Sequence, residues 1–102
     1  MKIAENHRFI VKGTSAPTIE VDLMFQAAYV RFRKARVAKT VGRPSQAMHL
    51  AVDLDESGEV IGIEAIGFSE LRLDRLLKTA GVRTPAGMDL GKAAFRPVPS
   101  RV

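Results

Sequence analysis

The chain of 102 residues contains no cysteine and no tryptophan, and it has only one tyrosine and five phenylalanines. Without cysteine, neither a disulfide framework nor a cysteine-based zinc or redox site can form. No apolar run is long enough to cross a bilayer, and the first eight residues lack the apolar segment of a signal peptide. These absences predict a cytoplasmic protein with no membrane segment.

The composition that remains is that of one small globular domain with excess positive charge. Hydrophobic residues make up 46% of the chain, and 16 Lys and Arg against 11 Asp and Glu give a formal net charge of +5. An aliphatic core in so short a chain leaves a small margin of stability, and such domains often gain burial from a partner. We therefore expect self-association or a protein partner. The charge would also attract nucleic acid or acidic protein surfaces.

Two runs in the first half of the chain have the pattern of β-strands. Apolar and polar residues alternate over residues 18–33, and a shorter β-like run covers residues 36–41. We expect these runs to form a hairpin whose turn is centred on Lys34 and Ala35, with Phe32 opposite Val37.

The clearest hairpin comes next. Residues 49–54 and 59–66 flank the polar segment 55–58, whose glycine at the end suits a type I turn closed by a left-handed residue. On this register His49 lies opposite Glu64. The side chains expected to share one face are Leu50, Val52, Ile61 and Ile63.

A change of period then predicts one helix over residues 69–80, capped by Ser69 and ended by Gly81. Its apolar stripe consists of Leu73, Leu76, Leu77 and Ala80. The predicted fold is α+β: an antiparallel sheet of four or five strands built from hairpins, with the helix packed on one face. Residues 1–18 would form an arm or an extra strand, residues 19–82 the domain, and residues 83–102 a mobile tail with several Pro and Gly.

Several stretches of this sequence are similar to the YuzE-like family of small bacterial proteins. The similarity is carried by Asp22, Ala27, the Tyr29-Val30-Arg31 segment, and residues 51–64 with their acidic turn and Gly-Ile-Glu strand. It covers roughly residues 19–80. The function of that family is unassigned, so the resemblance implies a fold and supplies no catalytic residue.

The acidic turn also matches a calcium-binding template. Asp53, Asp55, Ser57 and Gly58, followed by Glu64 at the twelfth position, fit the EF-hand loop. An EF-hand loop joins two helices, however, whereas both flanks here alternate as strands. We therefore interpret the segment as a hairpin turn and expect no metal and no cofactor.

A basic cluster lies at the end of the first predicted hairpin. A two-stranded ribbon can enter a major groove, and an exposed tyrosine can stack on a base. Lysine and arginine at such a place also protect a sheet edge from aggregation. The candidate contacts for nucleic acid or an acidic partner are Tyr29, Arg31, Arg33, Lys34 and Arg36.

Signals for catalysis are few. Neither His7 nor His49 has the spacing of a metal ligand or a partner of a nucleophile, and we expect His49 and Glu64 to form a surface ion pair. No nucleophile elbow or glycine-rich phosphate loop is present. The sequence thus predicts a non-catalytic interaction module, acting as a homo-oligomer or with a protein partner, rather than an enzyme. The alternative is a nucleic-acid-binding accessory protein that uses residues 31–36.

Overall fold

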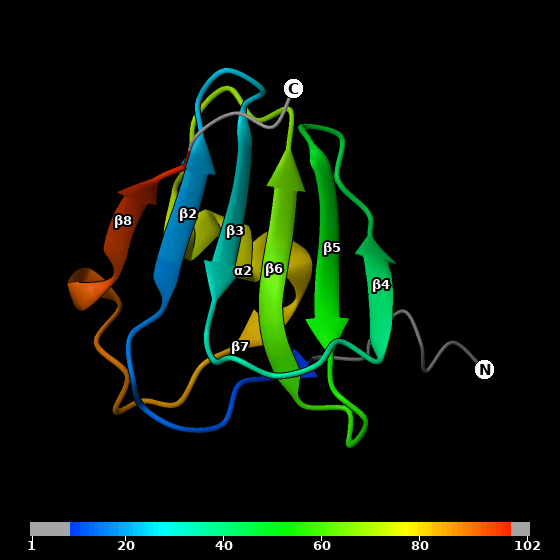
Figure 1. Ribbon diagram of the computed structural model, residues 1–102, viewed down its shortest axis with the longest axis vertical. Helices are drawn as coiled ribbons and strands as arrows, with labels where there is room; N and C mark the ends of the chain where they lie inside the picture. Colours follow the sequence, from blue (N-terminus) through cyan, green and yellow to red (C-terminus); the bar gives the residue numbers. More distant parts are fainter. Residues whose placement is uncertain (1–8, 99–102) are drawn as a thin grey trace.

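A six-stranded sheet with one α-helix behind it makes up most of the computed structural model, which describes residues 9–98 (Figure 1). The strand order is β4-β5-β6-β3-β2-β8, and within this sheet of described strands only the β2–β8 pair is parallel. The α+β class and the mainly antiparallel sheet are therefore confirmed, with more strands than the four or five expected. The strands are β2 (Thr18–Asp22), β3 (Ala27–Arg31), β4 (Lys39–Arg43), β5 (His49–Leu54), β6 (Val60–Ile66) and β8 (Ala94–Pro97).

The remaining elements lie on the helix side of the sheet or at its edge. They are β1 (Phe9–Ile10), α2 (Leu73–Ala80), β7 (Val82–Arg83) and the 3-10 turn η1 (Leu90–Lys92). β1 pairs in parallel with β7 and not with the large sheet. The described part of the N-terminal arm is thus a short strand, and it contributes the buried Phe9 and Val11 to the core.

The core lies between the sheet and α2. Across the four central strands the fully buried residues Ile19, Val30, Ile63 and Val52 stand in register. Alternation along each strand places these side chains on one face, the inner face. α2 closes that face with Leu76, Leu77 and Ala80, as its apolar stripe predicts. The opposite face, here called the outer face, carries no helix formed by residues 9–98 (Figure 1).

The prediction of a first hairpin between residues 18–33 and 36–41 is wrong. The expected run over residues 18–33 is divided into β2 and β3 by a turn at residues 23–26, and β3 pairs with β2 and β6 rather than with β4. The Asp22 carboxylate makes this turn by accepting the backbone N–H of Met24 and of Phe25. Residues 32–38 instead cross from β3 to β4, held where Phe32 N–H bonds to the Ile61 carbonyl.

The β5–β6 hairpin and its turn are confirmed, with a bulge. Asp53 is opposite Gly62 but Leu54 is opposite Val60, so Ile61 is the extra residue. Leu50 and Val52 therefore share a face with Ala65 and Ile63. The expected place of Ile61 in that set is wrong, because a bulge shifts the alternation by one residue.

The helix begins four residues later than expected. The N-cap residue is Arg72, with extended backbone angles of φ −124° and ψ 118° and no side-chain cap, so Ser69 does not cap it. Phe68 is buried and Leu71 packs against the core, and the chain between them bends at Ser69 and Glu70 instead of starting the helix. Gly81 ends the helix as predicted, in the left-handed conformation with φ 73°.

The segment expected to be a mobile tail contains secondary structure, namely η1 and β8. β8 adds a parallel edge strand to β2, and Met88 is buried in the core. The backbone N–H groups of Ala94 and Val98 donate to the carbonyls of Pro17 and Val21. Because successive residues of a strand direct their N–H groups to opposite sides, the backbone nitrogen of Pro97 points away from β2. Proline needs no partner for an N–H there, which is why it fits this edge. Residues 99–102 lie outside the described residues.

Candidate functional site

The outer face carries a chain of polar contacts centred on Tyr29. Its hydroxyl donates to an Asp53 carboxylate oxygen at 2.8 Å, and Thr40 donates to the other oxygen at 2.6 Å. The Tyr29 ring lies across Gly62, where an added Cβ would be 2.5 Å from a ring carbon. Because Gly62 has no side chain, the tyrosine can reach from β3 over β6 to β5. The contacts link four neighbouring strands.

This environment keeps Tyr29 protonated. Burial raises the pKa of Tyr29 above its ordinary value, and the hydrogen bond and negative charge of Asp53 raise it further. A tyrosine with a raised pKa is a hydrogen-bond donor rather than a base or nucleophile at neutral pH. The arrangement therefore favours a structural role for the Tyr29–Asp53 pair.

Two arginines of the expected basic cluster are engaged within the chain. Arg31 pairs with Glu20 at 3.2 Å and stacks over the Tyr29 ring at 4.9 Å from its centroid. Arg33 pairs with Asp55, and with Glu59 at 3.9 Å. The structure thus brings Tyr29 and Arg31 together on the outer face and directs Arg33 to the β5–β6 turn.

The other two cations of that cluster lie in the crossing segment. Lys34 and Arg36 are exposed, and they form no ion pair within residues 9–98. Since β3 and β4 are not hairpin partners, the four cations do not form the tip of a two-stranded ribbon. A major-groove ribbon is therefore not built here.

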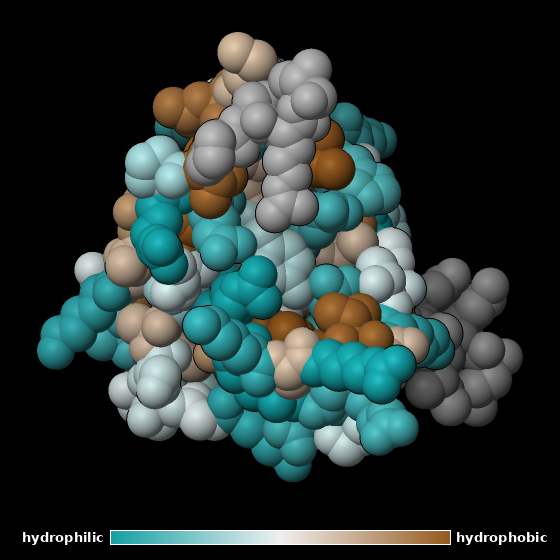
Figure 2. Space-filling view, in the orientation of Figure 1, coloured by the Kyte–Doolittle hydropathy of each residue, from teal (hydrophilic) through white to brown (hydrophobic). Residues whose placement is uncertain are grey.

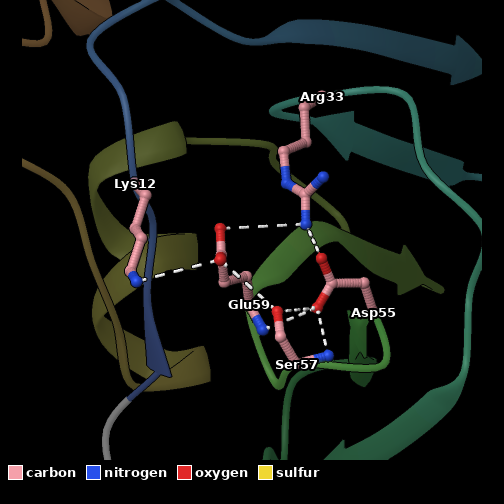
Figure 3. Close-up of polar contacts among 5 residues, drawn as sticks. All are labelled: Lys12, Arg33, Asp55, Ser57 and Glu59. Atoms are coloured by element: carbon pink, nitrogen blue, oxygen red, sulfur yellow. Dashed lines mark hydrogen bonds and ion pairs between the residues drawn. The ribbon is translucent and has the colours of Figure 1, made fainter.

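The acidic turn is closed by its own side chains (Figure 3). One Asp55 oxygen accepts the Ser57 N–H at 2.9 Å, the Ser57 hydroxyl at 2.7 Å and the Glu59 N–H at 3.0 Å. Glu59 lies between Arg33 and Lys12, with its nearest oxygen 3.8 Å from the lysine nitrogen. These carboxylates serve the hairpin, and in the described chain no group of three or more acidic or histidine residues is placed to hold a metal.

His49 forms the expected surface pair with Glu64, at 3.7 Å, with both side chains exposed. The pair is diagonal, because His49 is opposite Ile66 and Glu64 is opposite Ala51. The expectation that His49 stands directly opposite Glu64 is wrong, because the bulge changes the hairpin register. His7 lies outside the described residues.

The β2–β3 turn presents three apolar side chains to solvent. Leu23, Met24 and Phe25, which we call the apolar turn, are 77%, 73% and 50% exposed. In Figure 2 hydrophobic residues gather at the upper end of the molecule, over this turn. The turn is fixed in place by the Asp22 carboxylate and by a 2.8 Å bond from Gly67 N–H to the Gln26 carbonyl.

Sequence reasoning missed the apolar turn. The expected alternation over residues 18–33 included Leu23 and Phe25 as apolar strand residues. The signal was Met24, which is apolar at a position where strict alternation requires a polar residue.

A hollow of about 230 Å³ lies at the same end of the sheet as the apolar turn. Met48, Leu71 and Leu76 give it apolar walls, and Arg72 and Arg75 are among its polar lining residues. A second, more open hollow of about 710 Å³ separates residues 36–38 from residues 55–57. Its acidic lining residues are Asp55, which is already bonded within the turn, and the exposed Glu56.

Comparison with protein-family models, curated proteins and solved structures finds no match. The resemblance to the YuzE-like family therefore remains a prediction, as does a cytoplasmic location. Within residues 9–98 no helix combines the length and apolar character needed to span a bilayer.

Proposed function

We propose that this chain is a small, non-catalytic interaction module. The observation that carries the proposal is the apolar turn. Tight turns are normally made by Gly, Pro, Asn, Asp and Ser, whereas this one displays Leu, Met and Phe at the most exposed part of the hairpin. Contiguous exposed apolar surface on a small domain often marks a site of contact with another molecule.

The conformation of the turn supports the same proposal. Asp22 accepts two backbone N–H groups, at 3.1 Å and 3.4 Å, and Gln26 adopts the left-handed conformation with φ 50°. A turn fixed in this way loses little conformational entropy when a partner covers it. The acidic and tyrosine side chains that could serve chemistry are instead occupied by contacts within the chain: Glu20, Tyr29, Asp53, Asp55 and Glu59.

The test is an affinity experiment with a matched pair of variants. The tagged wild-type chain, the Leu23→Ser/Met24→Ser variant and a Val37→Ser control are passed through extract of the native host, and self-association is measured in parallel. Val37 is 45% exposed and lies in the crossing segment, so its variant changes exposed apolar surface elsewhere. We expect an association that the turn variant loses and the control keeps. A monomer that retains no turn-dependent partner contradicts the proposal.

The second candidate function is nucleic-acid binding, and the exposed cations of the crossing segment favour it. Lys34, Arg36 and the neighbouring Lys39 are exposed without an ion pair in the described chain. Their charge, with the net +5 of the chain, would attract phosphates. Arg31 and Arg33 are less suited to this contact because each is paired with a carboxylate.

Fluorescence anisotropy with mixed DNA and RNA oligonucleotides tests this candidate at low and then physiological salt. If the function is correct, binding persists at physiological salt and weakens in Lys34→Ala/Arg36→Ala, with a shallower salt dependence of about one unit of slope for each lost phosphate contact. An unchanged affinity in that variant eliminates the crossing segment as a nucleic-acid contact.

A further inference from the structure

We infer that the partner of the apolar turn is a second copy of this chain. In this arrangement the apolar turn of each copy enters the hollow at the end of the other copy's sheet. The inference rests on the proposed function and specifies the partner. Both halves of the contact, a protruding apolar group and a hollow with apolar walls and a polar rim, are present on one chain.

The two surfaces differ in shape in the way that such a contact requires. The apolar turn protrudes, with Leu23 and Met24 each more than 70% exposed. The hollow of about 230 Å³ has Met48, Leu71 and Leu76 in its walls. If the apolar turns of two copies met each other, two convex surfaces would be in contact. If each turn enters the hollow of the other copy, its apolar side chains are buried against the apolar walls of that hollow.

The two halves are also held in a fixed relation to each other. The bond from Gly67 N–H to the Gln26 carbonyl joins the apolar turn to the segment after β6, and that segment continues through residues 69–72 along the hollow. The segments that carry the two surfaces, the β2–β3 turn and the chain that follows β6, lie at the same end of the sheet (Figure 1). A two-fold axis at that end lets both contacts form together, which gives a closed dimer rather than an open chain of molecules.

Charge is complementary across the proposed contact. Asp22 precedes the apolar turn, and the hollow is lined by two arginines, Arg72 and Arg75, against one acidic residue, Glu70. Arg75 forms no ion pair within residues 9–98, so the lining keeps a net positive charge. Docking places the acidic base of one turn near the basic rim of the other hollow. A rim pair of this kind favours the correct orientation more than it adds affinity.

The area is sufficient for a weak dimer. The exposed parts of Leu23, Met24 and Phe25 equal about two whole side chains, or roughly 300 Å² of surface for each turn. Two turns and the two surfaces that receive them total about 1,000 Å², which is the lower end of specific interfaces. A dimer that dissociates on dilution is therefore expected.

Analytical ultracentrifugation across a dilution series tests the inference. It compares the wild type, the turn variant Leu23→Ser/Met24→Ser, the hollow variant Ala47→Glu and the control Val37→Ser, each first shown by thermal unfolding to be folded. Ala47 is an exposed residue at the hollow, and a glutamate there opposes both the apolar turn and Asp22. We expect a concentration-dependent dimer in the wild type and control, and a dissociation constant raised at least about tenfold in either variant.

Mixing the turn variant with the hollow variant gives the decisive measurement. The mixed dimer keeps one intact turn and one intact hollow, so the mixture should associate more strongly than either variant alone. Wild type that stays monomeric, a dimer indifferent to both variants, or mass that grows beyond a dimer overturns the inference. Loss of the dimer in the turn variant alone also overturns it, because the turn would then pack elsewhere. A monomeric wild type that still retains a turn-dependent partner from extract would leave the proposed function standing.

Discussion

Replacing Gly62 by alanine should destabilise the protein far more than the same change at Gly42. Both glycines lie in strands of the large sheet, on the outer face. At Gly62 an added Cβ would stand 2.5 Å from the Val30 carbonyl oxygen and 2.5 Å from a carbon of the Tyr29 ring. At Gly42 it would meet nothing within 4 Å.

The cost can be worked out from those contacts. The Tyr29 ring can turn away, but the Val30 carbonyl belongs to the sheet and cannot. Overpacking of this kind costs about 1–3 kcal/mol. Moving the ring also breaks the 2.8 Å hydrogen bond to Asp53, a further loss of about 1–2 kcal/mol at a partly exposed site. After a gain of about 0.5 kcal/mol from the less flexible unfolded chain, Gly62→Ala should lose about 2–4 kcal/mol.

Urea unfolding at neutral pH measures both variants against the wild type. A loss of that size lowers the thermal midpoint of a domain of about 100 residues by roughly 10–25 °C. Gly42→Ala should remain within about 0.5 kcal/mol of the wild type or become slightly more stable. A Gly62→Ala protein as stable as the wild type, or an equal loss in both variants, refutes the close approach of Tyr29 to Gly62.

Three further predictions concern side chains with defined partners. Tyr29 is the only tyrosine and tryptophan is absent, so tyrosinate absorbance reports Tyr29 alone. This absorbance should not rise near pH 10 until the protein unfolds. Asp53→Asn should lower the pH at which the rise begins. Because the folded pKa is raised, the stability from this group is complete below about pH 10 and is lost as pH rises toward the folded pKa; a native titration near 10 contradicts this. Asp55→Ala removes three turn hydrogen bonds and an arginine pair, and should cost about 1–2 kcal/mol in urea unfolding, whereas the exposed neighbour Glu56→Ala should cost almost nothing. Arg43→Met removes a 2.8 Å bond to the Ala80 carbonyl at the end of α2 and a cation–π contact with Phe9, so the same assay should show a loss of about 1–2 kcal/mol. A wild-type value for either Asp55→Ala or Arg43→Met would show that its contacts contribute nothing to stability.

The elements that could be predicted from the sequence are those fixed by neighbouring residues. The β5–β6 hairpin follows from alternation on both sides of a polar turn ending in Gly58, and the end of α2 follows from Gly81. Each signal lies within a few residues of the structure that it determines. The same holds for the apolar stripe of the helix.

The errors have two causes: unusual turn residues and partners that lie far away in the sequence. The β2–β3 turn was missed because it consists of apolar residues, although the neighbouring Asp22 closes it. β3 pairs with β6 in addition to β2, and no pattern near Lys34 could have indicated β6 as a partner. β8 is a strand because the edge of β2 is available to it, not because of its own sequence.

In the candidate site, too, the residue types could be predicted from the sequence and their contacts could not. The basic residues could be identified by type, but their partners could not. Arg31 meets Glu20 from β2, and Arg33 meets Asp55 from the β5–β6 turn. Whether a cation is available to a ligand depends on such pairs, and these depend on the full strand order.

The parallel pairing of β2 with β8 has a consequence for folding. β2 is the first strand of the large sheet along the chain and β8 is the last, so their contact closes the longest loop in that sheet. Loop closure of this length is slow, and until it occurs one edge of β2 has unpaired backbone groups. A ribosome-bound chain that has not yet exposed residues 94–97 therefore has β2, in place of β8, as the edge of any sheet that it has formed.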